Sequence, residues 1–184
     1  HRLGRHHGAG STSLTTLQVG QKVRVTGTVK ENFGYTRIEN VSSVQVTGTG
    51  TITPVNIPPA TFSVYAFATN EQYEGMLVQI KNPAGPLYVV DKNADGPPSN
   101  FGEYRVGDDR FNPNSGTRVL AGRQTNSTFS SLNVSFVNDT AWTTQDGIMN
   151  VPACVVDSTR SFDSVVGIIY YSFSNMKLLP RNNG

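Results

Sequence analysis

Histidine and cysteine are almost absent from this 184-residue chain. The three histidines, His1, His6 and His7, all lie within the first seven residues, and Cys154 is the single cysteine. Histidine has the side chain whose ordinary pKa lies closest to neutrality, and it is the commonest metal ligand. Without it, the body of the chain has no Ser-His-Asp or Cys-His arrangement and no His-rich zinc site. We therefore expect a protein that is not an enzyme.

Charge is also scarce. Charged residues make up 15% of the chain, and Arg2 and Arg5 account for the small excess of basic residues, 15 against 13 acidic. A neutral body offers little electrostatic attraction to nucleic acid, whose binding depends on phosphate neutralisation. One cysteine allows no intrachain disulfide, and Cys154 lies in an apolar run where a small buried side chain is the expected role. No apolar stretch approaches the ~20 residues of a membrane span, so we expect none.

Glycine, proline, serine, threonine and asparagine fill the remaining composition, and short alternating segments recur. Residues 22–30 alternate with Val23, Val25 and Val29 on one face, and Gly27 interrupts that face as a bulge or bend does. Residues 32–34 form a turn, 35–38 return as the partner strand, and 43–47 form a third strand. Further strands are predicted at 76–80, 87–90, 103–106 and 117–121, with a short helix around 69–73 and a closing hairpin of 165–171 and 176–179. This pattern predicts a small closed barrel or a sandwich.

Five segments in this order resemble the OB-fold-like module that precedes the catalytic domain of large secreted bacterial nucleases. They are Val23–Val29, Phe33–Ile38, Gln72–Val78, Asn100–Glu103 and Val166–Pro180. The resemblance implies an all-β fold, an elaborated OB-like Greek-key barrel with long loops, and an extracellular or cell-surface location in a bacterium. In that family cleavage belongs to a separate metal-dependent domain with catalytic histidines, which nothing here matches. The resemblance therefore brings no catalytic activity.

The expected organisation is an extended N-terminal arm over 1–18, one barrel domain over 19–181, and a short tail over 182–184. The arm carries His1, Arg2, Leu3, Arg5, His6 and His7, and its glycines allow close backbone approach. A segment laid along the sheet edge of a neighbouring copy gains main-chain hydrogen bonds, and such a head-to-tail contact builds a filament when its rotation does not close. A cloning remnant and a metal site at His6-His7 are the alternative interpretations of this leader.

Asp91, Asn93 and Asp95 match the first half of a calcium-binding loop, with Gly96 for its sharp turn. The twelfth loop position is Gly102, where an EF-hand needs glutamate, so a simple Asx-rich turn is the alternative. No cofactor is required by this interpretation, and Ca²⁺ is the one candidate. An acid–base set of Asp108-Asp109 with Asp91 and Asp95 is another interpretation of these carboxylates, but nothing in the sequence places them across a substrate, and solvated loop charges are the expected role.

Two other groups of residues complete the candidates. Arg24, Tyr35 and Arg37 form a possible nucleic-acid surface, in which the aromatic ring stacks on bases. The glycosylation acceptor pattern occurs at Asn40, Asn126, Asn133 and Asn138. We expect a non-catalytic extracellular structural subunit that self-assembles with its own copies through the arm. The alternative is a nucleic-acid-binding OB-fold accessory module of a secreted nuclease system.

Overall fold

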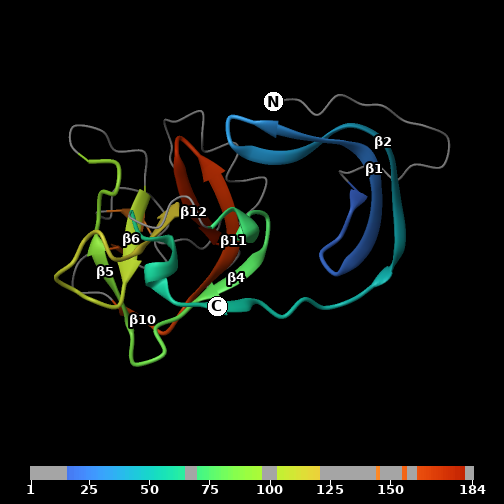
Figure 1. The fold of residues 1–184 in the computed structure, drawn as a ribbon. Coiled ribbons are helices and arrows are strands. Elements are labelled where there is room, and N and C mark those ends of the chain that lie inside the picture. Colours follow the sequence, from blue (N-terminus) through green and yellow to red (C-terminus); the bar gives the residue numbers. More distant parts are fainter. Residues whose placement is uncertain are drawn as a thin grey trace. The chain divides into compact units, whose positions relative to one another are not determined.

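The chain forms an all-β structure, as the sequence predicts. The computed structural model describes residues 16–64, 70–96, 103–120, 144–145, 155–156 and 161–180. Contacts group the chain into two compact units, His1–Thr53 and Pro54–Gly184, which are described separately (Figure 1). The predicted division into an arm, a barrel domain and a tail stays a prediction.

The first unit contains one long antiparallel hairpin. Strand β1 (Gln21–Asn32) pairs with β2 (Tyr35–Thr49) from Gln21↔Thr49 to Asn32↔Tyr35. The strands are joined by a two-residue turn in which Phe33 and Gly34 both have positive φ, 54° and 77°. Two positive φ values are the signature of a type I′ turn, whose twist matches that of the flanking strands. The predicted turn and the strand 22–30 are confirmed.

Strand β2 runs further than the sequence predicts. The predicted segments 35–38 and 43–47 belong to one strand, because Asn40 adopts a left-handed conformation and the chain continues through a β-bulge. The bulge lies opposite Gly27, the residue that interrupts the alternating valines of β1. A Cβ on Gly27 would stand 2.5 Å from Ile38 Cγ2 and 2.8 Å from the Glu39 carbonyl oxygen, so glycine alone allows the strands this approach.

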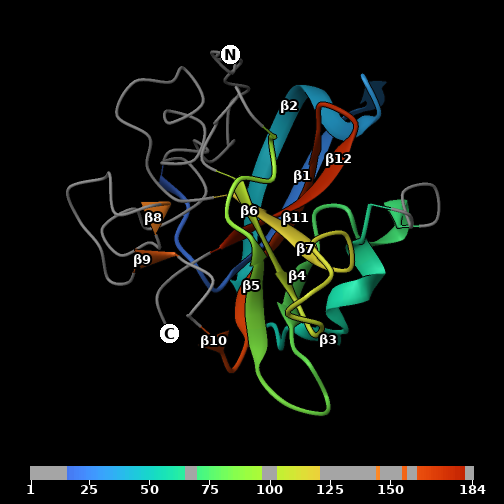
Figure 2. The same cartoon turned by 90° about the vertical axis from the view of Figure 1, so that its left-hand side faces the viewer.

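The second unit contains an eight-stranded sheet that curls around its core (Figure 2). Its strand order is β10-β5-β6-β7-β12-β11-β4-β3, antiparallel except for the β12/β7 and β3/β4 pairs. The bounds are β3 (Val55–Ile57), β4 (Leu77–Ile80), β5 (Leu87–Asp91), β6 (Glu103–Gly107), β7 (Thr117–Leu120), β10 (Ser161–Phe162), β11 (Val165–Ser172) and β12 (Asn175–Pro180). A separate parallel pair joins β8 (Thr144–Gln145) and β9 (Val155–Val156).

The predicted strands at 76–80, 87–90, 103–106, 117–121 and the closing hairpin all lie on observed strands, with ends shifted by at most one residue. The helix predicted at 69–73 is a single 3-10 turn, η4 (Glu71–Tyr73). Another 3-10 turn, η2 (Pro59–Phe62), begins with a proline, whose fixed φ suits a helix start.

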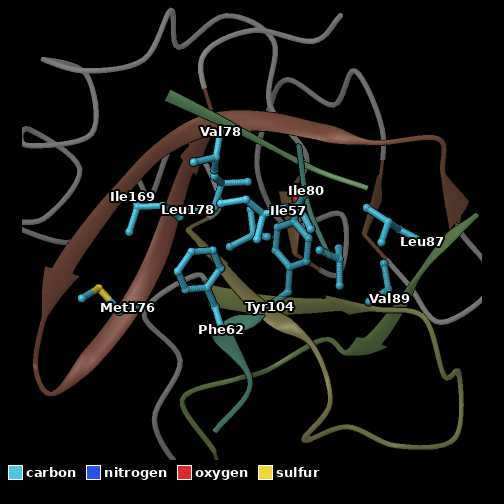
Figure 3. Close-up of a cluster of buried hydrophobic side chains, with 12 residues drawn as sticks. Ile57, Phe62, Val78, Ile80, Leu87, Val89, Tyr104, Ile169, Met176 and Leu178 are labelled. Atoms are coloured by element: carbon cyan, nitrogen blue, oxygen red, sulfur yellow. The ribbon is translucent and has the colours of Figure 1, made fainter. Parts of the chain in front are cut away.

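The core of the second unit lies on the concave face of the curled sheet (Figure 3). It consists of apolar side chains from alternate strand positions and from η2: Ile57, Phe62, Val78, Ile80, Leu87, Val89, Tyr104, Val106, Val119, Ile169, Met176 and Leu178. Phe62 packs edge-on against Tyr73, with ring centroids 5.6 Å apart. Each such side chain stabilises the fold by about 1.5–3 kcal/mol relative to remaining in water.

The strands differ in how their edges are protected. The outermost strands of the large sheet are short: β3 has three residues between Pro54 and Pro58, and β10 has two. Short edges and flanking prolines both hinder the addition of a foreign strand. In contrast, β1 and β2 have 12 and 15 residues and no proline, and within the described residues they pair only with each other. The long strand edges therefore belong to the hairpin.

Candidate interaction site

One face of the hairpin is aliphatic. The register places three pairs of branched side chains directly opposite each other: Val23 and Val46, Val25 and Val44, and Val29 and Ile38. Val44 is buried at 2% exposure, whereas the outer two pairs are 40–70% exposed. Of the eleven large hydrophobic side chains exposed in the described residues, seven lie between 16 and 53. A two-stranded hairpin cannot bury such a face alone, so among the described residues this unit has the most apolar surface left to cover.

The opposite face of the hairpin is polar, and it contains the predicted nucleic-acid surface. Arg24, Tyr35 and Arg37 lie opposite Gln45, Asn32 and Lys30, which places all three on this face by alternation. The Arg37 and Lys30 side chains on this face both form ion pairs with the Glu39 carboxylate.

Partial desolvation raises the pKa of the Glu39 carboxyl, but hydrogen bonds and charge from Arg37 and Lys30 outweigh it and lower the pKa overall. This carboxylate would compete with a phosphate for the same cations.

The predicted calcium loop is an Asx turn held by an arginine. The Asp91 carboxylate accepts a hydrogen bond from the Asn93 backbone N–H at 2.9 Å, and Gly96, with φ of 75°, donates its N–H to the Asn93 carbonyl. The Arg118 guanidinium donates to the Asp95 carboxylate at 3.1 Å and to the Ala94 carbonyl at 2.5 Å. Among the described residues, no three His, Cys, Asp or Glu side chains gather as metal ligands do. The calcium site stays a prediction.

A buried network of charged side chains lies on the convex side of the central strands, and the sequence analysis missed it. Glu103 of β6 accepts hydrogen bonds from Arg118 of β7 and from Lys177 of β12, and all three side chains are at least 90% buried. Arg118 also pairs with Asp95, so two carboxylates face two cations. Burial, followed by the charge of Arg118, lowers the pKa of the neighbouring Arg105 guanidinium. Glu103 and Arg105 alternate with Tyr104 and Val106, which is the sequence pattern of a half-exposed strand. The local sequence therefore does not indicate that these charged side chains are buried.

Two hairpin turns carry a phenylalanine at the same unusual position. Phe33 in the β1–β2 turn has φ of 54° and is 95% exposed, and Phe173 in the β11–β12 turn has φ of 49° and is 71% exposed. Asparagine, aspartate or glycine normally occupies this first position of a type I′ turn, because a bulky side chain is strained there. A third phenylalanine, Phe111 in the β6–β7 loop, is 90% exposed. These rings are the most exposed aromatic side chains among the described residues.

A small open cavity lies near the β11–β12 turn. It measures about 90 Å³ and is lined by Phe62, Val64 and Met176 on its apolar side, with Arg105, Asn70 and Ser174 among its polar neighbours. The Val64 backbone N–H donates to the Asn114 carbonyl of the β6–β7 loop at 3.4 Å. Since β7 and β12 run parallel, the loop before β7 and the turn before β12 lie at the same end of the sheet.

Several predicted sites fall outside the described residues. These are the arm residues His1, Arg2, Leu3, Arg5, His6 and His7, the acceptor asparagines Asn126, Asn133 and Asn138, and Cys154. Asn40 is described, and it is exposed at the bulge of β2. Asp108 and Asp109 are exposed in the β6–β7 loop, and the Asp109 carboxylate caps the Phe111 backbone N–H at 3.0 Å.

No family model, curated protein or solved structure matches this chain. The resemblance to the secreted-nuclease module stays a prediction. In the described part of the chain, helices long and apolar enough to span a membrane are absent.

Proposed function

We propose that this chain is a non-catalytic structural subunit of an extracellular assembly, in which copies bind one another. The observation that carries the proposal is the exposed aliphatic and aromatic surface of the hairpin unit. Val29, Phe33, Ile38 and Val46 all remain at least 40% exposed on a two-stranded element. Apolar surface of this kind on one element is typical of a protein–protein contact. The scarcity of histidine and cysteine favours a binding role over catalysis.

The hairpin and the N-terminal arm are the two elements proposed to join the copies. The arm was predicted from its glycines and basic residues, and the hairpin adds long strands without proline. Either element adds main-chain hydrogen bonds when it lies along a strand of a neighbour. The extracellular location is part of the proposal and is supported by the neutral, Thr/Ser/Asn-rich composition and by the resemblance to a secreted module.

Sedimentation velocity and negative-stain microscopy of the full chain, with and without residues 1–15, test this function. We expect the sedimentation coefficient of the full chain to rise with protein concentration, and oligomers or fibres to be visible. Loss of association on truncation assigns the contact to the arm, and retention assigns it to the remaining surface. A monomer at every concentration up to about millimolar would contradict the proposal, because even weak specific contacts have dissociation constants in that range.

Nucleic-acid binding is the second candidate, as expected of an accessory module of a secreted nuclease system. The observation in its favour is that Arg24, Tyr35 and Arg37 share the polar face of the hairpin. Fluorescence anisotropy with labelled single-stranded DNA tests it. If Arg24, Arg37 and Lys30 neutralise three phosphates, affinity falls about 20-fold between 50 and 200 mM salt. Absence of binding at 50 mM salt, or binding unchanged by Arg24→Gln with Arg37→Gln, removes this candidate.

A further inference from the structure

The Arg105 side chain is buried with few partners of its own. The residue is 5% exposed on β6, where it lies opposite Arg118 of β7. Within the described part of the chain, its guanidinium makes one hydrogen bond, from Nη1 to the Gly116 carbonyl at 3.3 Å, and no ion pair. A guanidinium has five N–H donors, and a buried charge is normally paired. Arg105 therefore has both charge and donors left to satisfy.

The charges around Arg105 compensate it only in part. Its cross-strand neighbour Arg118 directs its own donors to the carboxylates of Glu103 and Asp95. Burial and the charge of Arg118 lower the pKa of the Arg105 guanidinium, and the surrounding carboxylates offset only part of this effect. A negative group placed against Arg105 would relieve the unfavourable charge, because an opposite charge nearby stabilises the ionised form.

Arg105 lines the open cavity near the β11–β12 turn. Its hydrogen bond to Gly116 places the guanidinium where β7 begins, which is the end of the sheet at which β12 also begins. Ser63 and Ser174 line the same cavity, and within the described residues their hydroxyls make no hydrogen bond. The cavity measures about 90 Å³, several times the ~10–15 Å³ that one water needs, so it has room for a ligand of a few non-hydrogen atoms.

The apolar wall of the cavity selects among anions. Phe62, Val64 and Met176 form this wall, and Phe62 and Met176 also belong to the hydrophobic core (Figure 3). Such side chains offer no hydrogen bond to the outer oxygens of a phosphate or sulfate, but they suit a hydrocarbon chain. A carboxylate accepts two parallel hydrogen bonds from the guanidinium fork and leaves its carbon chain free to contact apolar groups. The lining therefore favours an organic carboxylate over an inorganic anion.

We propose that this cavity binds a small aliphatic carboxylate, whose oxygens pair with Arg105 and whose short carbon chain lies against Phe62 and Met176. The Ser63 and Ser174 hydroxyls supply further hydrogen bonds to the ligand. Because the volume is limited, affinity rises with chain length only until the cavity is full. This site does not depend on the proposed self-assembly, so either proposal can fail without the other.

Thermal melting of the full chain at pH 7 with sodium acetate, propionate or butyrate measures this binding, and sodium chloride at equal ionic strength is the reference. A ligand that binds only the folded protein raises the melting midpoint. We expect dissociation constants of about millimolar order. Propionate binds about fourfold more tightly than acetate, because burial of one further methylene contributes that factor. Shifts of the Ser174 and Asn175 amide signals in NMR spectra locate the ligand at this cavity.

Two variants and a control assign the binding to this cavity. Arg105→Gln removes the guanidinium and weakens propionate binding about tenfold or more, as expected for loss of hydrogen bonds to a charged group. Val64→Trp fills the open side of the cavity and has the same effect while it leaves the buried charges intact, so it decides the question if Arg105→Gln does not fold. The control is Arg110→Gln, which removes an exposed cation over the Tyr88 ring and keeps the affinity within about twofold of wild type.

Three results would overturn the inference. The first is a melting midpoint and amide signals that match those in chloride at up to about 50 mM propionate, where millimolar binding would be close to saturation. The second is wild-type affinity in the Val64→Trp or Arg105→Gln protein. The third is phosphate binding at least as tight as propionate binding, which assigns the cavity to inorganic anions instead.

Discussion

Glu103 carries the only carboxylate seen to contact both Lys177 and Arg118 in the described part of the chain, and its replacement by glutamine measures what that charge contributes. All three side chains are buried, and Glu103 accepts hydrogen bonds from both cations. Glu103→Gln keeps the shape of the side chain but removes its charge, which leaves the Lys177 ammonium buried without an anion. Breaking a buried ion pair on one side costs about 3–5 kcal/mol. For a chain of this size, that free energy lowers the unfolding midpoint by roughly 10–15 °C.

Circular dichroism melts at pH 7 provide the assay, with urea titration as a second measure. Glu39→Gln is the matched control, because Glu39 also pairs with two cations but on the exposed hairpin, where we expect no measurable change in midpoint. Adding Lys177→Met to Glu103→Gln removes the buried cation that lost its partner, so the double variant is more stable than Glu103→Gln alone. A Glu103→Gln midpoint within about 2 °C of wild type would refute the reasoning, because a buried charge cannot lose its partner at so small a cost.

Three further predictions follow from single positions. Gly167→Ala places a Cβ 2.7 Å from the Leu179 carbonyl carbon in the β11–β12 ladder, so we expect a lower melting midpoint. Gly85→Ala is the control, because its Cβ would meet only a side-chain nitrogen at 3.6 Å, and we expect its midpoint to be unchanged or slightly higher. Equal midpoints for the two variants would contradict the packing. The Glu39 carboxyl titrates by NMR below its usual 4.5, so its small contribution to stability is complete above that pH and is lost as the pH falls through the folded-state pKa; a midpoint at or above 4.5 would contradict the pairing. If Asp91 and Asp95 hold Ca²⁺, millimolar Ca²⁺ raises the melting midpoint of the wild type but not of the Asp91→Asn/Asp95→Asn variant, and an unchanged wild type removes the calcium prediction.

Much of the strand pattern follows from local sequence. Alternating valines predict β1, and Asn32-Phe33-Gly34 predicts its turn, because both signals depend on neighbouring residues only. The predicted division of β2 into two strands, 35–38 and 43–47, was wrong for a physical reason. The polar segment at Asn40 has the sequence of a break, but Asn40 adopts a left-handed conformation in a β-bulge and the strand continues. Bulges depend on the partner strand, which a single segment does not specify.

The candidate sites were harder to predict than the strands. Arg24, Tyr35 and Arg37 lie on the same face of the hairpin, and their role as a nucleic-acid surface stays a prediction. The network around Glu103 was missed, because it needs β12 to lie beside β7, from which it is far apart in the sequence. The cavity near the β11–β12 turn was missed because its lining residues come from segments that are far apart in the sequence, such as Phe62, Arg105 and Met176.

The size of the wild-type particle as a function of concentration is the most direct test of whether this protein acts by binding copies of itself. Sedimentation equilibrium of the full chain from micromolar to millimolar concentration is the measurement. We expect the weight-average mass to increase steadily above the 19.9 kDa of one chain, with extended particles in the microscope. A constant mass of one chain across that range would contradict the account.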